Sequence, residues 1–436
     1  MSASPSLHFN AFIWPNGYHE SAWRVVDDDV RGVLGLPYFS QVARTAERGL
    51  LDAVFLADNM AIPEYRASFL PQAMFDPVTV LSALAGVTEH IGLIATGSTT
   101  YSKPWDLARR FATLDHLSAG RAGWNIVTTL TSLAAAAFGE TAHPDHDDRY
   151  ERAHEFVEVV CALWDSWGDD ALVGDRAAGV WADRSRVHTV RHHGRFHDME
   201  GLLPFPRPPQ GHPVLVQAGQ SSAGIGLAAR YAELVFSGPT TLEQAQVFRR
   251  DLDARLLENG RDPRQVPVLP ATVITLGGTE AEARAKAERL DELASADFRW
   301  RNALWTAGFD PDDFDPDVPL PRSLWADPQG ASSQAQRLFK AAEARPGVPL
   351  RELTRTLSGG AGQLRFVGTL EQLAELVTTW QDAGAADGLT LMGSTLPDEL
   401  EIFVDHVAPL LQRAGRFRTE YSGSTLRDHL GLPRPS

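Results

Sequence analysis

The segment IGLIATGSTTYSKPWDLARRFATLDHLSAGRAGWNIVTT, residues 91–129, decides the fold of this chain. Residues 91–96 are apolar and rich in β-branched side chains, which is typical of a strand buried on both faces, and they run into the polar residues 97–100. At Pro104 a helical pattern begins, with apolar side chains every three or four positions. Residues 122–129 predict a second strand, which also ends in hydroxyl side chains. Strand, helix and strand in this order form a βαβ unit, whose parallel strands end on the same face.

The rest of the chain repeats this alternation of short apolar strands and amphipathic helices. The predicted strands are residues 7–14, 52–56, 91–96, 122–129, 213–217, 234–237, 268–276 and 388–392. Besides the helix after Pro104, the predicted helices are residues 38–50, 77–90, 150–167, 222–231, 242–258, 280–293 and 370–383. Strands that are separated almost throughout by helices favour a (β/α)8 TIM-type barrel over an open doubly wound sheet.

Two segments are longer than a minimal barrel needs. Residues 167–212 contain a His- and Arg-rich run that predicts a small hairpin, and residues 295–362 are rich in Pro, Asp and Trp. Insertions of this size usually shape or cover the active site at the C-terminal face of the strands, so we expect them there. Residues 397–436 predict a further helix and an ordered C-terminal extension. We therefore expect one barrel domain, residues 1–436.

Composition excludes several classes of function. The chain has 56 acidic against 40 basic side chains, which disfavours nucleic acid and anionic membranes as partners because both need a basic face. A single cysteine, Cys161, excludes an internal disulfide framework and falls in an apolar helical pattern. The N-terminus, MSASPSLHFN, lacks the features of a secretory signal, and no stretch is apolar enough to span a membrane. We expect a cytoplasmic protein.

Polar side chains stand at the predicted strand ends, where a barrel binds its ligands. Asp58 follows the second strand and either binds a ligand ring or caps the next turn, and its position favours neither. The hydroxyls of Ser98, Thr99 and Thr100 are possible ligand donors, with ordinary turn chemistry as the alternative. Asn125 interrupts an apolar strand, so a neighbour or a ligand must satisfy its amide.

Two further groups of polar residues lie where helices begin. His146 and Tyr150 are four residues apart and share one helical face if the helix begins early. Residues 217–224, QAGQSSAG, follow a buried strand and open a helix. Their backbone N–H groups, with Ser221 and Ser222, form a potential phosphate site, and a plain serine N-cap is the alternative.

A metal site is the less favoured interpretation of the histidines. His143 and His146 have HxxH spacing, but Pro144 lies between them and no third ligand follows at a telling distance. A metal-dependent barrel hydrolase would have to add His192 and His193 to this pair. We therefore predict no metal, and keep the hydrolase as an alternative.

Long contiguous stretches resemble the bacterial luciferase-like superfamily, and within it the group of nitrilotriacetate monooxygenase, dibenzothiophene sulfone monooxygenase and pristinamycin IIA synthase. These stretches are GLLDAVFLADNM, TEHIGLIATGSTTYSKPWDLARRFATLDHLSAGRAGWNIVTT, DDRYERAHEFVEVVCALWDSW, PFPRPPQGHPVLVQAGQSSAGIGLAARYAELVF, FVGTLEQLAEL and RTEYSGSTLRDHLGLPRP. They span nearly the whole chain, so the resemblance is more specific than any single short motif.

The resemblance implies a two-component monooxygenase. Such an enzyme takes reduced FMN from a separate NAD(P)H:flavin reductase and uses O2, through a C4a-(hydro)peroxyflavin, to oxidise an organic small molecule. Relatives of this kind are commonly homodimers or homotetramers. The positions that match the family's flavin contacts are Asp58, Ser98, His146, Tyr150 and Ser221, with Asn125 and Ser222 as second-rank candidates. By analogy, Asp58 and Ser98 lie nearer the flavin ring, and the other three first-rank residues lie around the phosphate and ribityl chain.

Some positions depart from the family pattern. Gly97 stands where many relatives have alanine, Gln220 stands where serine is common, and residues 392–395 replace a stretch that usually contains proline and more aromatic residues. The flavin-site prediction stands despite these changes. The alternatives within the superfamily are a deazaflavin-dependent oxidoreductase and a catalytically silent flavin-binding subunit.

The substrate pocket is where we expect this chain to differ from its relatives. Three segments are expected to form it: residues 16–24, 300–325 and 393–396. Because the flavin carries the hard chemical step, no catalytic residue is assigned. His19 and Trp23 are candidates to face the substrate, with core packing as the alternative for Trp23.

Overall fold

The computed structural model describes residues 6–26, 29–129, 132–325, 333–357, 359 and 362–435. Residues 1–5, which carry half of the N-terminal stretch considered for a signal, lie outside this part of the chain. So do several residues of the second predicted insertion: 326–332, 358, 360 and 361. Among the described residues, no helix is both long enough and apolar enough to cross a membrane.

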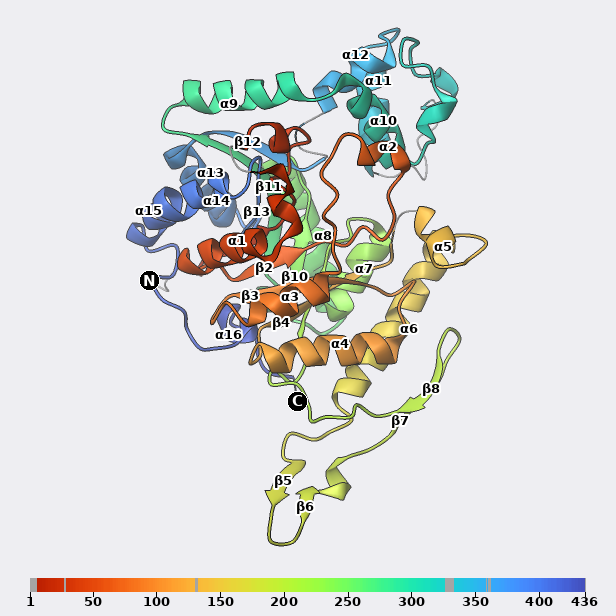
Figure 1. The fold of residues 1–436 in the computed structure, drawn as a ribbon, viewed down its shortest axis with the longest axis vertical. Helices are drawn as coiled ribbons and strands as arrows, with labels where there is room; N and C mark the ends of the chain where they lie inside the picture. Colours follow the sequence, from red (N-terminus) through yellow and green to blue (C-terminus); the bar gives the residue numbers. More distant parts are fainter. Residues whose placement is uncertain are drawn as a thin grey trace.

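Within the described residues, eight parallel strands close into a barrel, as the alternation of strands and helices predicts (Figure 1). Their bounds are β1 His8–Phe12, β2 Ala53–Leu56, β3 Gly92–Ser98, β4 Ala122–Val127, β9 Val214–Gln217, β10 Leu234–Ser237, β11 Val268–Gly277 and β13 Gly388–Gly393. Around the barrel the order is β1, β2, β3, β4, β9, β10, β11 and β13, which pairs with β1 again. The fold prediction is confirmed, and each strand was predicted from the sequence.

One strand of the sheet was not predicted. β12, Leu364–Thr369, pairs in parallel with the second half of β11, beginning at Thr272, whereas the first half of β11 pairs with β10. Its side chains are mostly half-buried, so the continuous apolar run that marks the barrel strands is missing. β12 therefore lies outside the closed barrel, beside the C-terminal half of β11.

The helices cover the outside of the barrel (Figure 1). Their bounds are α1 Leu36–Arg48, α3 Pro77–Ala85, α4 Pro104–Leu117, α6 His146–Trp164, α7 Ser222–Tyr231, α8 Leu242–Glu258, α9 Glu280–Leu293, α13 Leu370–Asp382, α14 Asp398–Ile402 and α15 Ala408–Arg413. Aromatic side chains fill the layer between strands and helices. The Trp124 ring centroid lies 5.8 Å from that of Phe111 and 6.0 Å from that of Phe156. A Cβ atom on Gly97 would come within 2.8 Å of the indole nitrogen of Trp124, which accounts for glycine at this departure from the family pattern.

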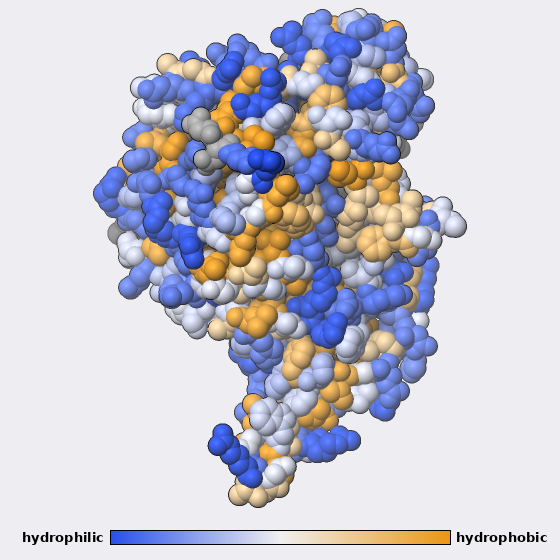
Figure 2. All heavy atoms as spheres, viewed as in Figure 1, coloured by the Kyte–Doolittle hydropathy of each residue, from blue (hydrophilic) through white to orange (hydrophobic). Residues whose placement is uncertain are grey.

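The second insertion forms a helical lid with its own apolar core. It contains α10 Ala296–Ala307, α11 Ser333–Ala344 and α12 Leu350–Leu353, packed around Trp300 and Leu304. It contacts the loop after β2, which holds the short helix α2, Glu64–Ala67, because the rings of Phe69 and Phe298 lie 5.9 Å apart. This insertion therefore lies at the C-terminal ends of the strands, as expected. Figure 2 shows mostly hydrophilic side chains over the lid and more apolar ones below it.

The first insertion follows a different course. It forms two hairpins, β5 Leu172–Asp175 with β6 Val180–Ala182, and β7 Val190–His193 with β8 Asp198–Gly201. The insertion starts after the C-terminal end of α6, which is the end opposite the C-terminal face of the strands because helix and strands run antiparallel. β5 and β6 extend away from the barrel (Figure 1), whereas β7 and β8 lie along α6 through a 2.9 Å bond between His192 and Glu155. The hairpin prediction is met, but β5 and β6 do not cover the strand ends.

The C-terminal extension closes the opposite end of the barrel. After α15 the chain reaches the short helix α16, Leu426–His429, and Leu426 is fully buried among the barrel's interior side chains. A Cβ atom on Gly92 would come within 2.5 Å of the Leu426 side chain, so the glycine at the start of β3 makes room for this plug. The extension thus contributes to the core of the barrel.

A buried ion pair anchors the extension to the barrel. Asp52, directly before β2, is fully buried, accepts the Phe9 backbone N–H at 2.6 Å and bonds the His8 ring at 3.0 Å. Arg418 of the extension donates to the same carboxylate. Burial raises the pKa of Asp52, but the charges of Arg418 and His8 outweigh this effect and hold the pKa at about 2.

Arg418→Met should lower the free energy of unfolding by about 3–5 kcal/mol, because it leaves a buried carboxylate without its main partner. The stabilisation from the depressed Asp52 pKa should be fully present above about pH 4 and fade as the pH falls toward about 2. Urea denaturation followed by circular dichroism measures both effects. The control is Arg416→Met, whose partner Asp382 is exposed, and it should cost less than about 1 kcal/mol. Equal losses in the two variants would contradict the assignment.

Candidate active site

The C-terminal ends of the strands form the mouth of the barrel, and Ser98 ends β3 there. Its buried hydroxyl lies 2.7 Å from the Thr129 hydroxyl and accepts the backbone N–H groups of Thr100 and Tyr101 at 3.2 Å. Thr99 and Thr100 donate their hydroxyls to carbonyls at the end of β4. Turn chemistry thus occupies these hydroxyls in the structure, and they fix the β3 and β4 ends to each other.

Asn125 of β4 presents a free acceptor inside the mouth. Its side chain is 3 % exposed, and its amide nitrogen donates to the Thr96 hydroxyl at 2.9 Å. The Thr96 hydroxyl in turn donates to the Leu56 carbonyl at 2.9 Å. The amide oxygen of Asn125 is buried and has no hydrogen-bond partner among the described residues. Because a buried acceptor is normally satisfied, this atom points to a donor that a ligand supplies.

Asp58 stands in the loop after β2 and is partly buried. Burial and, to a lesser extent, the nearby Asp76 raise the pKa of its carboxyl group, Arg110 acts in the opposite direction, and the resulting pKa is about 6. A carboxyl group with a pKa near neutrality is typical of a functional site rather than of a simple turn cap.

A cradle for an anion lies where α6 and α7 begin. α6 starts at His146, four residues earlier than predicted, so His146 and Tyr150 share one face with ring centroids 4.9 Å apart. The Tyr150 hydroxyl lies over the turn before α7, because Cβ atoms added to Gly219 and Gly224 would lie 3.2 and 3.1 Å from it. The turn leaves little room for a side chain at position 219, where a Cβ atom would also lie 2.5 Å from the Gln217 side chain and 2.9 Å from the Gly224 Cα atom.

Ser221 and Ser222 stand at the start of α7 in different roles. Ser221 is the N-cap, and its hydroxyl oxygen accepts the Gly224 N–H at 3.1 Å, which leaves the hydroxyl proton free to be donated. Ser222 is held by Arg255, which donates to the Ser222 carbonyl at 2.6 Å and to its hydroxyl at 3.2 Å. The Ser221 hydroxyl therefore keeps a proton that it can donate, and Ser222 is tied to α8.

His19 and Trp23 hold loops together. His19 is 3 % exposed, with one ring nitrogen 3.1 Å from Asp291 of α9 and the other 2.9 Å from the Ser21 hydroxyl. The Trp23 indole donates to the Phe69 carbonyl at 3.1 Å. These contacts favour a positioning role for both side chains over direct contact with a substrate.

The histidines of the hydrolase alternative do not gather into a ligand set. His143 bonds the Tyr101 hydroxyl at 2.7 Å, and His192 and His193 pair separately with Glu155 and Asp198. Within the described part of the chain, no three His, Cys, Asp or Glu side chains are arranged to hold a metal ion.

Other polar groups inside the barrel were missed in the sequence. Asn10 of β1 and Thr390 of β13 are neighbours in register, and within the described residues their buried side-chain oxygens have no partner. The signal that could have found them is the one that marks Asn125, a polar residue within a buried apolar strand.

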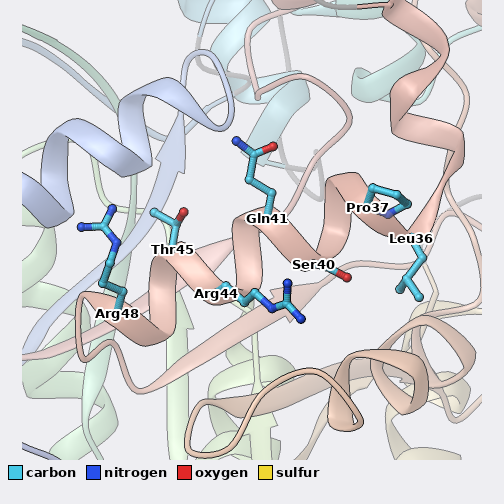
Figure 3. Close-up of a pocket in the computed structure, with 7 residues that line it drawn as sticks. All are labelled: Leu36, Pro37, Ser40, Gln41, Arg44, Thr45 and Arg48. Atoms are coloured by element: carbon cyan, nitrogen blue, oxygen red, sulfur yellow. The ribbon is translucent and has the colours of Figure 1, made fainter.

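The open hollow on α1 is a different surface feature (Figure 3). It is lined by Leu36, Pro37, Ser40, Gln41, Arg44, Thr45 and Arg48, all from the outer helix layer. Two of its polar side chains are held by the fold, since Gln41 donates to Glu401 at 3.3 Å and Arg44 donates to the Val87 carbonyl at 3.2 Å. The ligand-binding features described above all lie at the strand ends and not here.

Fold and site together define a barrel enzyme with a ligand site at its strand ends, and comparison with known proteins places it in a family. The chain matches the Luciferase-like monooxygenase family over residues 21–387. It is 40% identical to N-acetyl-S-(2-succino)cysteine monooxygenase of Bacillus subtilis (strain 168) and 41% identical to nitrilotriacetate monooxygenase component A of Aminobacter aminovorans, in each case over 100% of this chain and 98% of the relative. The crystal structure of riboflavin lyase with modified FMN and riboflavin superposes with a TM-score of 0.88 at 30% identity, covering 98% of this chain and 96% of that one. The chain belongs to the luciferase-like monooxygenase family.

Asp58→Asn should raise the free energy of unfolding above about pH 7 and leave it nearly unchanged near about pH 4. The pKa of about 6 in the folded state exceeds the ordinary value, so the fold disfavours the carboxylate and its cost grows as the pH rises through about 6. Two pKa units correspond to about 3 kcal/mol, which partial exposure reduces to about 1 kcal/mol.

Urea denaturation at the two pH values measures this difference. The control is Asp147→Asn, at the start of α6, whose carboxylate is 94% exposed. It should change the free energy of unfolding by less than about 0.5 kcal/mol at either pH. A change in Asp58→Asn that is the same at both pH values would rule out the raised pKa.

Proposed function

We propose that this protein is the oxygenase of a two-component system. It receives reduced FMN from a separate NAD(P)H:flavin reductase and uses O2 to oxidise an organic small molecule. The observation that carries this proposal is the cradle formed by the Tyr150 hydroxyl over the Gly219–Gly224 turn, at the start of a helix and on the mouth of the barrel. The modified FMN in the riboflavin lyase structure and the designation "component A" of the Aminobacter relative support it.

The residues at the mouth suit FMN at both of its ends. The start of α7 offers backbone N–H groups to the phosphate, and Ser221, Tyr150 and His146 add side-chain donors. The free amide oxygen of Asn125 suits an N–H group of the flavin ring. Hydrogen bonds to a charged group contribute about 1.5–3 kcal/mol each, so a few give micromolar binding and allow the flavin to arrive and leave.

The surroundings keep the reaction dry. Bound reduced FMN would supply the electrons that activate O2. Phe12, Phe55 and Phe236 form an apolar floor inside the barrel, with ring centroids 5.4 Å apart for Phe12 and Phe55 and 5.7 Å apart for Phe55 and Phe236. The lid contacts the loop after β2 through Phe298, whose ring centroid lies 5.9 Å from that of Phe69. Exclusion of water protects a reactive oxygen species from being lost before it meets the substrate.

Gly219→Ala should weaken FMN binding by about tenfold or more, because the added methyl group fills the cradle beneath the Tyr150 hydroxyl. The dissociation constant can be measured from the flavin fluorescence on titration with protein. Gly226→Ala is the matched control: a Cβ atom there has its nearest neighbour at 3.9 Å, so affinity should stay within about twofold. Equal affinities in the two variants would place the phosphate elsewhere.

Rapid mixing tests the reaction itself. The protein is loaded with reduced FMN without oxygen and then mixed with oxygenated buffer while the flavin absorbance is recorded. We expect the bound flavin to be reoxidised more slowly than free flavin by about tenfold or more, because the closed site excludes water. In Tyr150→Phe at the same protein concentration, we expect much of this slowing to be lost. Reoxidation at the rate seen in buffer, with the flavin shown to be bound, would contradict the proposal. Tighter binding of a deazaflavin than of FMN would instead support the hydride-transfer alternative.

A further inference from the structure

The lid meets the barrel on two sides, and one of these sides is held by charged groups. Asp291, near the C-terminal end of α9, precedes the lid in the chain, and Arg365, near the start of β12, follows it. Arg365 donates to the Asp291 carboxylate at 2.9 Å, and His19 Nε2, in the loop after β1, lies 3.1 Å from the same carboxylate. One carboxylate therefore clamps the two chain ends of the lid to each other and to the barrel.

A second charged contact reinforces the clamp. Arg299 of α10 donates to Glu20 of the loop after β1 at 3.4 Å, and these side chains are only 10% and 12% exposed. Burial raises the pKa of Asp291, but the hydrogen bonds from His19 and Arg365 outweigh burial and hold the pKa below its ordinary value. Parting the lid from the barrel on this side would leave partly buried charges without partners, which is strongly destabilising.

On the other side, α10 meets the loop after β2 along a seam of ring contacts (Figure 1). The ring centroids of Phe69 and Phe298 lie 5.9 Å apart, and the Arg66 guanidinium lies 5.2 Å from the Trp305 ring centroid. Between the described residues of α10 and of this loop, no hydrogen bond or ion pair crosses the seam. The seam therefore lacks the charged contacts that hold the clamp.

Polar atoms without partners are buried along the same seam. They are the Tyr65 hydroxyl, the Arg66 Nε and the Asn302 amide oxygen, and none has a hydrogen-bond partner among the described residues. Asn302 is four residues after Phe298 and three before Trp305, so it lies on the face of α10 that meets the loop. When the seam opens, water reaches these atoms, and the hydration that they gain offsets part of the cost of separating the rings.

A cavity lies directly behind the seam. Phe298 and Asn302 form part of its wall, and Glu20 and Thr354 form other parts. Thr354 is 1% exposed, so the seam and the clamp together close this part of the wall to solvent. The loops after β1 and β2 both leave the barrel at its mouth, so parting α10 from the loop after β2 opens a path from solvent past the cavity to the mouth.

We infer that the lid is a gate that turns about the clamp at Asp291 and opens along the seam between Phe69 and Phe298, and that small molecules reach the barrel mouth through this opening. The inference goes beyond the proposed function, because it does not depend on which molecule passes. Trp23 fits this arrangement. Its indole donates to the Phe69 carbonyl at 3.1 Å and holds the barrel side of the seam in place while α10 moves.

Thiol labelling without any ligand tests the gate. Thr354→Cys places a thiol on the cavity wall, and Cys161→Ser removes the single natural cysteine of the chain. The rate at which the thiol reagent DTNB labels this protein reports how often the cavity opens. We expect Phe69→Ala to raise the labelling rate by about tenfold or more, because it removes the ring contact that closes the seam. A thiol at Ala303, on the same wall, should give the same result.

Phe314→Ala is the matched control. Phe314 also makes a ring contact in the lid, with its centroid 5.8 Å from that of Phe309, but both rings pack within the lid's own core and not across the seam. This substitution should leave the labelling rate within about twofold. Asp291→Asn, which weakens the clamp, should raise the rate less than Phe69→Ala does.

FMN binding provides a second readout of the same gate. A gate limits entry and exit alike, so Phe69→Ala should speed both the association and the release of oxidised FMN by similar factors. The dissociation constant should then stay within about twofold, whereas loss of a binding contact would raise it. Stopped-flow flavin fluorescence measures the two rates.

Two results would overturn the inference. A labelling rate that Phe69→Ala leaves unchanged would show that the seam is not the opening, and a larger rise in Asp291→Asn than in Phe69→Ala would place the opening at the clamp. Failure of the wild type to bind FMN would count against the proposed function instead. The labelling rates, which need no ligand, would still decide whether the gate exists.

Discussion

The closure of the sheet between β10 and β11 is the contact on which the rest of the structure depends. It is short, since Val235 to Ser237 pair with Val268 to Pro270, and beyond that point β11 pairs with β12 instead. Closure places the C-terminal ends of all the barrel strands in one ring, so residues as distant in sequence as Asp58 and Ser221 face one mouth. Beyond Pro270, β12 replaces β10 as the neighbour of β11, so β10 and β11 separate on this side of the barrel. Gln363, which directly precedes β12, and Gln220 both approach Gly238 there.

Buried polar and charged groups are paired within the fold at one end of the barrel, and some of those described at the other end have no partner. At the N-terminal end, the C-terminal extension supplies arginines for buried acids, as Arg418 does for Asp52, and the charges are neutralised within the fold. At the C-terminal end, the pKa of Asp58 is raised to about 6, and the amide oxygen of Asn125 has no hydrogen-bond partner among the described residues. Stability is gained at one end, and at the other it is given up to keep groups available for ligands.

Sequence patterns predicted what depends on local burial. The barrel strands are continuous apolar runs, and polar interruptions or strand-end residues such as Asn125 and Ser98 indicated the mouth. β12 was not predicted because its side chains are mostly half-buried, so its sequence lacks the continuous apolar run of a barrel strand. The helices of the lid were missed for a related reason, since they bury their apolar faces against one another and not against the barrel.

The lid and the barrel are stabilised by separate apolar cores, so the residues of one can change without altering the packing of the other. The lid is packed around Trp300 and Leu304, and it contacts the loop after β2 through Phe69 and Phe298. The proposed flavin cradle, by contrast, is built from α6, α7 and the strand ends, whose side chains belong to the barrel. Substitutions in the lid can therefore alter the surface that the lid presents to the mouth without disturbing the turn at Gly219. A fold that separates the two in this way can keep one cofactor and vary its substrate, because the residues that bind each are stabilised by different cores.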